Sequence, residues 1–163
     1  MARARGKVVE KDNGWRKLKK TADELARRPG VTVGIHANAG AAAKKERGKE
    51  ASGETVLDVA IANEFGLGVP ERSFIRAWFD VAKEQNLTLA TSMLKRIMKG
   101  QISLDAALEQ MGARFVGEVQ KRIAQGVPPP NAPSTVARKG SSKPLIDTGQ
   151  MRQSVTYAVV KRS

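Results

Sequence analysis

Apolar residues near the start of the chain recur every three or four positions and then switch to every second position. The first pattern predicts an amphipathic helix that ends at Pro29-Gly30, and it consists of Trp15, Leu18, Ala22 and Leu25. The second pattern predicts a strand with one buried face, formed by Val31, Val33, Ile35 and Ala37. His36 falls on the opposite face of this strand, because successive side chains alternate between faces.

Three further helices are predicted in the middle of the chain. The first begins at Glu54, runs for about three turns and is closed by Gly66. The second begins near Arg72 and ends at Gly100, and its apolar positions are Phe74, Trp78, Val81, Ala82, Leu89, Met93 and Ile97. The third has Ser103 as its N-cap and ends at Gly126, with a stripe of Leu104, Leu108, Met111, Phe115, Val119 and Ile123. Because a short connection joins the two long helices, we expect an antiparallel hairpin.

Two segments show no apolar periodicity. Residues 38–53, rich in Ala, Gly, Lys and Glu, are predicted to form a mobile surface loop, and residues 126–144, which hold five of the seven prolines, an extended loop. After them, Asp147 and Gln150 resemble a capping box for a short helical turn, and alternation over 155–159 predicts a C-terminal strand.

Together these elements predict an α+β fold. Strands near both termini are expected to form a small antiparallel sheet, packed against the long central helical hairpin and flanking helices. The length of 163 residues favours a single domain over 1–163. No internal repeat at the periods of solenoid proteins is visible.

The net charge of +13 is unevenly distributed. Residues 1–28, 29–53 and 126–163 carry +6, +2 and +5, whereas residues 54–125 are neutral. Basic flanks around a neutral body indicate arms that face an anionic or acidic partner, and the alternative is solvated arms that keep the chain soluble. Apart from Trp15, aromatic residues are not interleaved with the basic clusters, so sequence-specific nucleic-acid recognition is poorly supported.

Residues suited to catalysis are scarce. The absence of cysteine and the presence of one histidine, His36, exclude thiolate chemistry and most metal sites and catalytic triads. Neither Gly6-Lys7 nor Gly48-Lys49 has the upstream glycine of a phosphate-binding loop. Asp80 and Glu84 lie one helical turn apart without a histidine or second carboxylate cluster nearby, so a solvated helix face is the simpler interpretation. We therefore expect no enzyme activity, no cofactor and no metal.

The apolar stretches of the chain are too short for a membrane. A spanning helix needs about 20 apolar residues, and the basic start of the chain is not followed by the apolar region of a signal peptide. The chain is therefore expected neither to span a membrane nor to be secreted.

Two motifs lie on either side of the long helices. The first reads IANEFG at 61–66, followed by PERSFIR at 70–76, and the second reads LIDTGQMRQSV at 145–155. They resemble the NEFG…PxRxFxR and LxDTGxLRxSI signatures of the tail-component family of long-tailed bacteriophages and of related virion-morphogenesis proteins. The order of the motifs and of the predicted elements around them also matches, so the resemblance spans nearly the whole chain.

This resemblance implies a non-enzymatic virion protein, either a neck or a tail-completion protein, that forms a ring of identical subunits at the head–tail junction. Its partners would be copies of itself and the neighbouring head-closure or connector and tail proteins, with DNA nearby and no membrane. Before assembly it would lie in the host cytoplasm. The candidate assembly residues in the two motifs are Asn63, Glu64, Phe65, Gly66, Pro70, Arg72, Phe74, Arg76, Asp147, Thr148, Gly149, Arg152 and Ser154.

The motif residues also have a physical interpretation of their own. Glu64 can accept a charge-assisted hydrogen bond from Arg72 or Arg76 across the turn at 66–70, which would set the angle between two helices. The alternative is that both arginines are surface charges of little energetic worth. In the second motif, Asp147 is expected to cap the turn that carries Arg152.

A ring of identical subunits requires two different, complementary faces on each subunit. The predicted loops at 38–53 and 126–144 are our candidates for these contacts, together with the open edge of the C-terminal strand. A basic, sequence-independent nucleic-acid-binding protein is the alternative function, and it predicts an affinity for DNA that falls steeply with salt. A nuclease is disfavoured, because the carboxylate and histidine cluster of metal-assisted hydrolysis is absent from the sequence.

Overall fold

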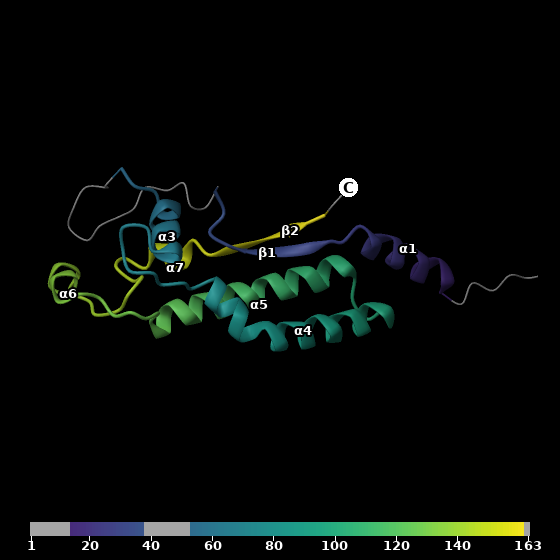
Figure 1. Cartoon of the computed structure of the whole chain (residues 1–163). Coiled ribbons are helices and arrows are strands. Elements are labelled where there is room, and N and C mark those ends of the chain that lie inside the picture. Colours follow the sequence, from purple (N-terminus) through teal and green to yellow (C-terminus); the bar gives the residue numbers. More distant parts are fainter. Residues whose placement is uncertain (1–13, 38–52, 162–163) are drawn as a thin grey trace, which may run out of the picture.

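The computed structural model describes residues 14–37 and 53–161. In chain order (Figure 1), its elements are α1 (Trp15–Ala26), β1 (Gly30–Gly34), α3 (Val56–Phe65), α4 (Arg76–Met98), α5 (Leu104–Gln125), α6 (Pro133–Lys139), α7 (Gln150–Gln153) and β2 (Thr156–Val160). The predicted α+β fold is confirmed. Apart from Gly53, the predicted mobile loop at 38–53 lies outside the described residues.

The sheet consists of β1 and β2, which pair antiparallel from Gly30 opposite Val160 to Gly34 opposite Thr156. The predicted pairing of strands near the two termini is therefore confirmed. Below the sheet runs α5, which contacts both strands (Figure 1). The close approach depends on Gly112 of α5, because a Cβ at this position would overlap the ring of Tyr157 in β2.

The other face of the sheet carries His36. Its Nε2 atom lies 3.0 Å from Thr32 Oγ1 in β1, and its Nδ1 atom lies 2.9 Å from Thr156 Oγ1 in β2. The position opposite the apolar residues of β1 agrees with the prediction. The imidazole joins the two strands through side-chain hydrogen bonds.

The two long helices α4 and α5 form the predicted hairpin (Figure 1). Ser103 is the N-cap of α5, as predicted, and its hydroxyl accepts a hydrogen bond of 3.1 Å from the backbone of Ala106. Trp78 near the start of α4 packs against Phe115 in the second half of α5, with 5.4 Å between ring centroids. Trp78 Nε1 also donates to Glu118 at 3.1 Å, so the indole has both an apolar neighbour and an acceptor.

The core lies at the end of the hairpin where α3 and α7 join it. Its fully buried side chains are Phe74, Val119, Ile123 and Val155, and around them lie Val56, Ala60, Trp78, Ala82, Val127 and Met151. Residues from α3, α4, α5 and α7 thus share one cluster. The core ties both motif segments to the helical hairpin.

The long helix α4 differs from the prediction in two respects. It begins at Arg76 and not near Arg72, and Val81, predicted to be apolar core, is 78% exposed. Val81 lies three residues after Trp78, at the solvent edge of the side that the buried Trp78 and Ala82 form. The later start has a specific cause in the contacts of Glu64, described below.

The segment predicted as an extended loop at 126–144 contains a helix, α6. Pro133 occupies one of the first helical positions, where its missing N–H is not needed and its fixed φ suits the helix. Gly140 ends the helix in the left-handed conformation. The prediction of an extended loop over this whole segment was wrong. Proline breaks a helix when it lies in the helix interior, but it is tolerated in the first turn.

The first helix, α1, stands at the far end of the molecule from α3 and α6 (Figure 1). The predicted helix is confirmed over Trp15–Ala26, yet none of its residues is buried. It contacts the C-terminal end of α4. There the side chain of Lys17 lies against Gly100, with Nζ 3.0 Å from the position that a Cβ on this glycine would occupy. Within residues 14–37 and 53–161, every helix is too short or too polar to cross a lipid bilayer.

Candidate functional site

The first motif begins on α3, whose own start is well defined. Thr55 and Asp58 form a capping box, in which Asp58 N–H donates to Thr55 Oγ1 at 3.1 Å and Thr55 N–H donates to Asp58 Oδ2 at 3.0 Å. Hydrogen bonds from the side chain and the backbone of Thr55 lower the pKa of Asp58. The Thr-x-x-Asp spacing at 55–58 is a signal in the sequence for this cap.

Glu64, near the end of α3, holds the start of α4. Its buried carboxylate accepts hydrogen bonds from the backbone N–H groups of Phe74 (2.8 Å), Ile75 (3.1 Å) and Arg76 (3.0 Å), and from the hydroxyl of Ser73 (2.8 Å). The first N–H groups of a helix have no partner within the helix. Glu64 therefore caps α4 from a different helix, and α4 begins at Arg76 because the preceding amides already point at this carboxylate.

The environment of Glu64 acts on its pKa in two directions. Burial raises the pKa, because it disfavours the charged carboxylate. The hydrogen bonds from Arg76, Ile75, Ser73 and Phe74 lower it and outweigh the burial, so that the pKa lies below the ordinary value of a glutamate. The carboxylate is thus held in its ionised form by the helix end that it caps.

Arg76 adds a second set of contacts to the same junction. Its Nε donates to Glu64 Oε1 at 3.2 Å and one of its Nη atoms donates to Glu71 Oε1 at 2.9 Å. The guanidinium also donates to the backbone carbonyl of Glu64 and lies 4.7 Å above the centroid of the half-exposed Phe65 ring. The predicted bond between Glu64 and Arg76 is confirmed.

Arg72 makes different contacts from those predicted. Its Nε donates to the carbonyl of Pro129 at 2.8 Å, and one of its Nη atoms donates to the carbonyl of Pro130 at 3.2 Å. The residue is 7% exposed, so it is neither a surface charge nor the partner of Glu64. Its backbone N–H donates to the carbonyl of Asn63 at 2.7 Å. Arg72 thus anchors the proline-rich segment to the turn between α3 and α4.

The turn between these helices needs its glycine. Gly66 has a φ of 71°, in the left-handed region, and a Cβ there would come within 3.2 Å of Glu71 Cβ. Pro70 follows in an exposed part of the turn, whereas Phe74 is fully buried beneath it. Asn63 donates its side-chain amide to the carbonyl of Val59 at 2.8 Å. All first-motif candidates therefore lie within or beside one turn.

The second motif forms the short helix α7. Gly149, with a φ of 80°, is its N-cap, and Thr148 Oγ1 accepts a 3.4 Å hydrogen bond from Gln150 N–H. Ser154 Oγ donates to the carbonyl of Gln150 at 3.0 Å, while Arg152 is exposed. The predicted capping role of Asp147 is wrong, since the cap lies two residues later.

Asp147 has a different position. Its Oδ1 atom is buried and lacks a hydrogen-bond partner within the described part of the chain. A buried carboxylate oxygen without a donor is costly. The atom belongs to a residue in the wall of a cavity, described next, where a ligand or a partner side chain could supply a donor.

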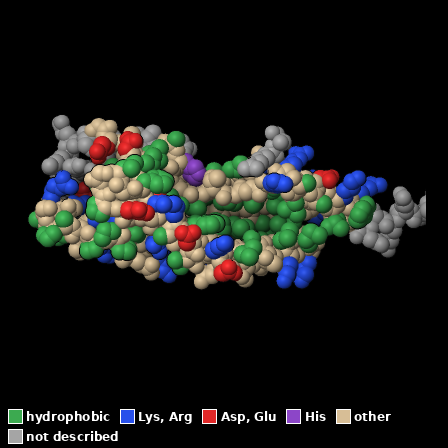
Figure 2. Space-filling view, viewed as in Figure 1, with side chains coloured by type: hydrophobic (Ala, Val, Ile, Leu, Met, Phe, Trp, Pro, Cys, Tyr) green, Lys and Arg blue, Asp and Glu red, His purple; other side chains and the backbone are tan. Residues whose placement is uncertain are grey.

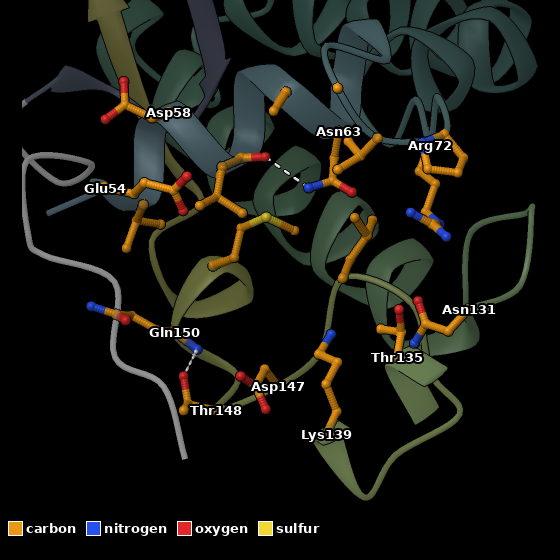
Figure 3. Close-up of a pocket in the computed structure, with 18 of the residues that line it drawn as sticks. Glu54, Asp58, Asn63, Arg72, Asn131, Thr135, Lys139, Asp147, Thr148 and Gln150 are labelled. Carbon is orange, nitrogen blue, oxygen red and sulfur yellow. Dashed lines mark hydrogen bonds between the residues drawn. The ribbon is translucent and has the colours of Figure 1, made fainter. Parts of the chain in front are cut away.

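Both motifs line one cavity of about 670 Å³ (Figure 3). Its walls are α3, the turn after it, α6 and residues 145–151, and its polar lining includes Asn63, Arg72, Asn131, Thr135, Lys139 and Asp147. The first-motif residues Asn63, Pro70 and Arg72 thus line the same cavity as Asp147, Thr148 and Gly149 of the second motif. Glu64 and Arg76 do not line it, and they set the angle of the wall instead.

The cavity combines three carboxylates, Glu54, Asp58 and Asp147, with the cations Arg72, Arg138 and Lys139. Such a lining suits a polar segment of a protein partner with charges of both signs better than a single small anion or cation. Among residues 14–37 and 53–161, no group of three or more His, Asp or Glu side chains is placed to hold a metal ion.

A scan against protein-family models found no match to this chain. Comparisons with curated proteins and with solved structures found none either.

Proposed function

We propose that this chain is a structural virion protein of a tailed bacteriophage, a neck or tail-completion protein that forms a ring at the head–tail junction and joins the tail to the head. One observation carries the proposal. The two motifs that resemble the tail-component family are far apart in the sequence, yet residues of both line one cavity. Motif residues that cooperate in space are expected if the resemblance reflects a shared fold.

The contacts of the motif residues suit a building block. Glu64 and Arg76 fix the direction in which α4 leaves α3, and Arg72 fixes the proline-rich segment beside them. Subunits of a closed ring must all present their two interfaces at the same angle, because a small error repeated around the ring prevents closure. Buried, charge-assisted hydrogen bonds at the turn supply this rigidity.

The cavity and the sheet edges give such a subunit surfaces for its neighbours. The two strands form a sheet of their own, so each leaves one edge without a partner strand among the described residues. An open edge can pair with a strand of another protein. The cavity, with its mixed charges, is the natural place for a polar segment of an adjoining head or tail protein.

Electron microscopy of virions with a tagged copy of this chain tests the proposal. We expect ring-shaped density at the head–tail junction, and we expect particles that lack the chain to accumulate heads and tails that are not joined. Absence of the chain from purified virions, together with normal joining without it, would overturn the proposal.

A basic surface favours sequence-independent nucleic-acid binding as the second candidate. Lys and Arg side chains are numerous at the end of the molecule that carries α1 (Figure 2), where Arg16, Lys17, Lys19 and Lys20 are exposed. Binding through such a surface would fall steeply as salt rises, with a slope that reflects the number of phosphates neutralised. Tight DNA binding with a steep salt dependence, in a protein absent from virions, would make this function the primary one.

A further inference from the structure

We propose that α1 of one copy docks on an exposed apolar stripe of α4 in a second copy, so that the chain associates head to tail. The stripe consists of Phe79, Leu87, Leu94 and Met98, and is called the α4 stripe below. The inference rests on the proposed ring and deepens it, since it names the two complementary faces that a ring needs. The predicted loop contacts and the sheet edges are not required for it.

The first face belongs to α1. Trp15 is 68% exposed, and Ala22, two turns later on the same side of the helix, is exposed as well. Leu18 and Leu25 are only partly covered. An amphipathic helix is held in proteins mainly by the burial of its apolar side, and in the described chain no residue of α1 is buried. Most of the apolar side of α1 is therefore not packed against other described residues.

The second face belongs to α4. Leu87, Leu94 and Met98 are spaced by seven and four residues, which places them on one side of the helix, and Phe79 lies about two turns before Leu87. Their exposed fractions lie between 43% and 63%. Trp78 and Ala82 lie on the opposite side of α4 and are buried in the core. The α4 stripe is thus a second apolar side that the described chain leaves open.

Charges beside the two faces are complementary. Lys19 lies one turn after Trp15, and it is exposed without an ion-pair partner among the described residues. Asp80 and Glu84 lie two turns and one turn before Leu87, and they are likewise exposed and not paired there. Lys83 lies between them, which leaves this part of α4 with an excess of one negative charge. Lys19 of one copy therefore suits the acidic border of the α4 stripe in another.

The α1 helix of the same chain leaves the part of the α4 stripe around Phe79 and Leu87 uncovered. Only residues 27–29 separate α1 from β1, and α1 lies beside Gly100, beyond the C-terminal end of α4. Phe79 lies about 30 Å along the helix from that point, at 1.5 Å per residue. Three connecting residues span about 10 Å when fully extended. The docking is therefore between copies, and because its two faces differ, it propagates into a ring or an open chain.

Size measurements on two single variants test the inference. In Trp15→Glu the α1 face is charged, and in Leu87→Glu the α4 stripe is charged; we expect each to reduce self-association by more than about tenfold, as for residues central to an interface. Val81→Glu is the matched control, because Val81 is an exposed apolar residue on another side of α4. It should associate like the unaltered chain. Circular dichroism shows whether each variant is folded.

Mixing the two variants gives the most discriminating result. The Leu87→Glu chain keeps an intact α1, and the Trp15→Glu chain keeps an intact α4 stripe. Together they should form a one-to-one dimer that grows no further, whereas each alone should remain monomeric. The charge pair can be tested in the same way: Lys19→Glu should weaken association roughly two- to fivefold, and Glu84→Lys in the same chain should restore part of it.

Each other result counts against this docking. Folded variants that associate like the unaltered chain, or that give no dimer when mixed, would overturn it. An unaltered chain that remains monomeric at high concentration would do the same. None of these results affects the proposed function, because ring density at the head–tail junction is observed in virions independently and would then require another interface.

Discussion

At the end of the molecule that holds α3, α6 and α7, two charged side chains are buried and hydrogen-bonded, whereas at the other end the helix α1 has no buried residue. Glu64 and Arg72 are 6% and 7% exposed, and Trp15 is 68% exposed. Burial of a polar group costs free energy unless hydrogen bonds within the protein replace those to water. Burial of an apolar group is favourable because it leaves water. The first end is therefore held together by buried polar contacts, although Phe65 and Leu67 are exposed there, whereas α1 is suited to gain apolar burial against another molecule.

The two ends of the molecule have different tasks. Contacts of the motif residues determine the shape of the subunit, because they set the angles between α3, α4 and the proline-rich segment. Contacts of α1 determine little of this shape, and substitutions there should change association more than stability. Substitutions at the two ends should separate these tasks.

The largest effect is expected for Glu64→Ala. Loss of the carboxylate leaves the N–H groups of Phe74, Ile75 and Arg76 without their acceptor, and breaking a buried charged contact costs about 3–5 kcal/mol of unfolding free energy. Chemical denaturation measures the change. Glu71→Ala is the control, since Glu71 also binds Arg76 but is exposed, and its loss should cost less than about 1 kcal/mol. Similar losses for both variants would contradict the capping role of Glu64.

Acid should weaken the same junction to a smaller extent, because a protonated carboxyl still accepts hydrogen bonds. The pKa of Glu64 is lower in the folded protein than in the unfolded chain, so the unfolded chain binds more protons in acid. The stabilisation is present above the ordinary pKa of a glutamate and is lost as the pH falls through the lowered pKa. Unfolding free energy measured against pH should show this loss. In Glu64→Gln the contribution of this residue to the pH dependence should disappear, and an unchanged pH profile would contradict it.

Arg72→Ala is expected to cost about 1.5–3 kcal/mol, as for hydrogen bonds to a charged group. The carbonyls of Pro129 and Pro130 lose their donor, so the segment that includes α6 should also open more readily. Denaturation measures the first effect, and limited proteolysis or hydrogen exchange within 126–144 measures the second. Arg138→Ala is a suitable control because Arg138 is exposed. Protection of this segment that does not change in Arg72→Ala would contradict the anchoring role.

The smallest change in unfolding free energy is expected for a substitution of Trp15, and Trp78 provides the contrast. Trp15→Ala should alter the unfolding free energy by less than about 0.5 kcal/mol, although it should impair self-association. Trp78→Ala should cost about 3–5 kcal/mol, since Trp78 is buried between α4 and α5. Thermal unfolding of both variants checks the difference. A loss of stability in Trp15→Ala comparable to that in Trp78→Ala would show that α1 is part of the core.

The candidate site was predictable from the sequence only in part. The bond between Glu64 and Arg76 followed from the charges on either side of a short turn, because residues a few positions apart across a turn are brought together by the turn itself. The binding of Arg72 to carbonyls at 129 and 130 had no such signal. A backbone carbonyl is present at every residue, so its partner cannot be identified from residue type. Asp147 was predicted to cap α7, but the N-cap of this helix is Gly149.

The sequence by itself determined the periodic elements and their ends. The apolar stripes of α1 and α5, the Ser103 cap and the alternation in β1 and β2 all depend on contacts within a few residues, and local spacing and residue type encode such preferences. Only the tertiary structure decided where α4 begins, that the proline-rich segment contains α6, and that both motifs enclose one cavity. Each of these depends on groups distant in sequence, above all the Glu64 carboxylate that caps a helix other than its own, and their meeting requires the packed core.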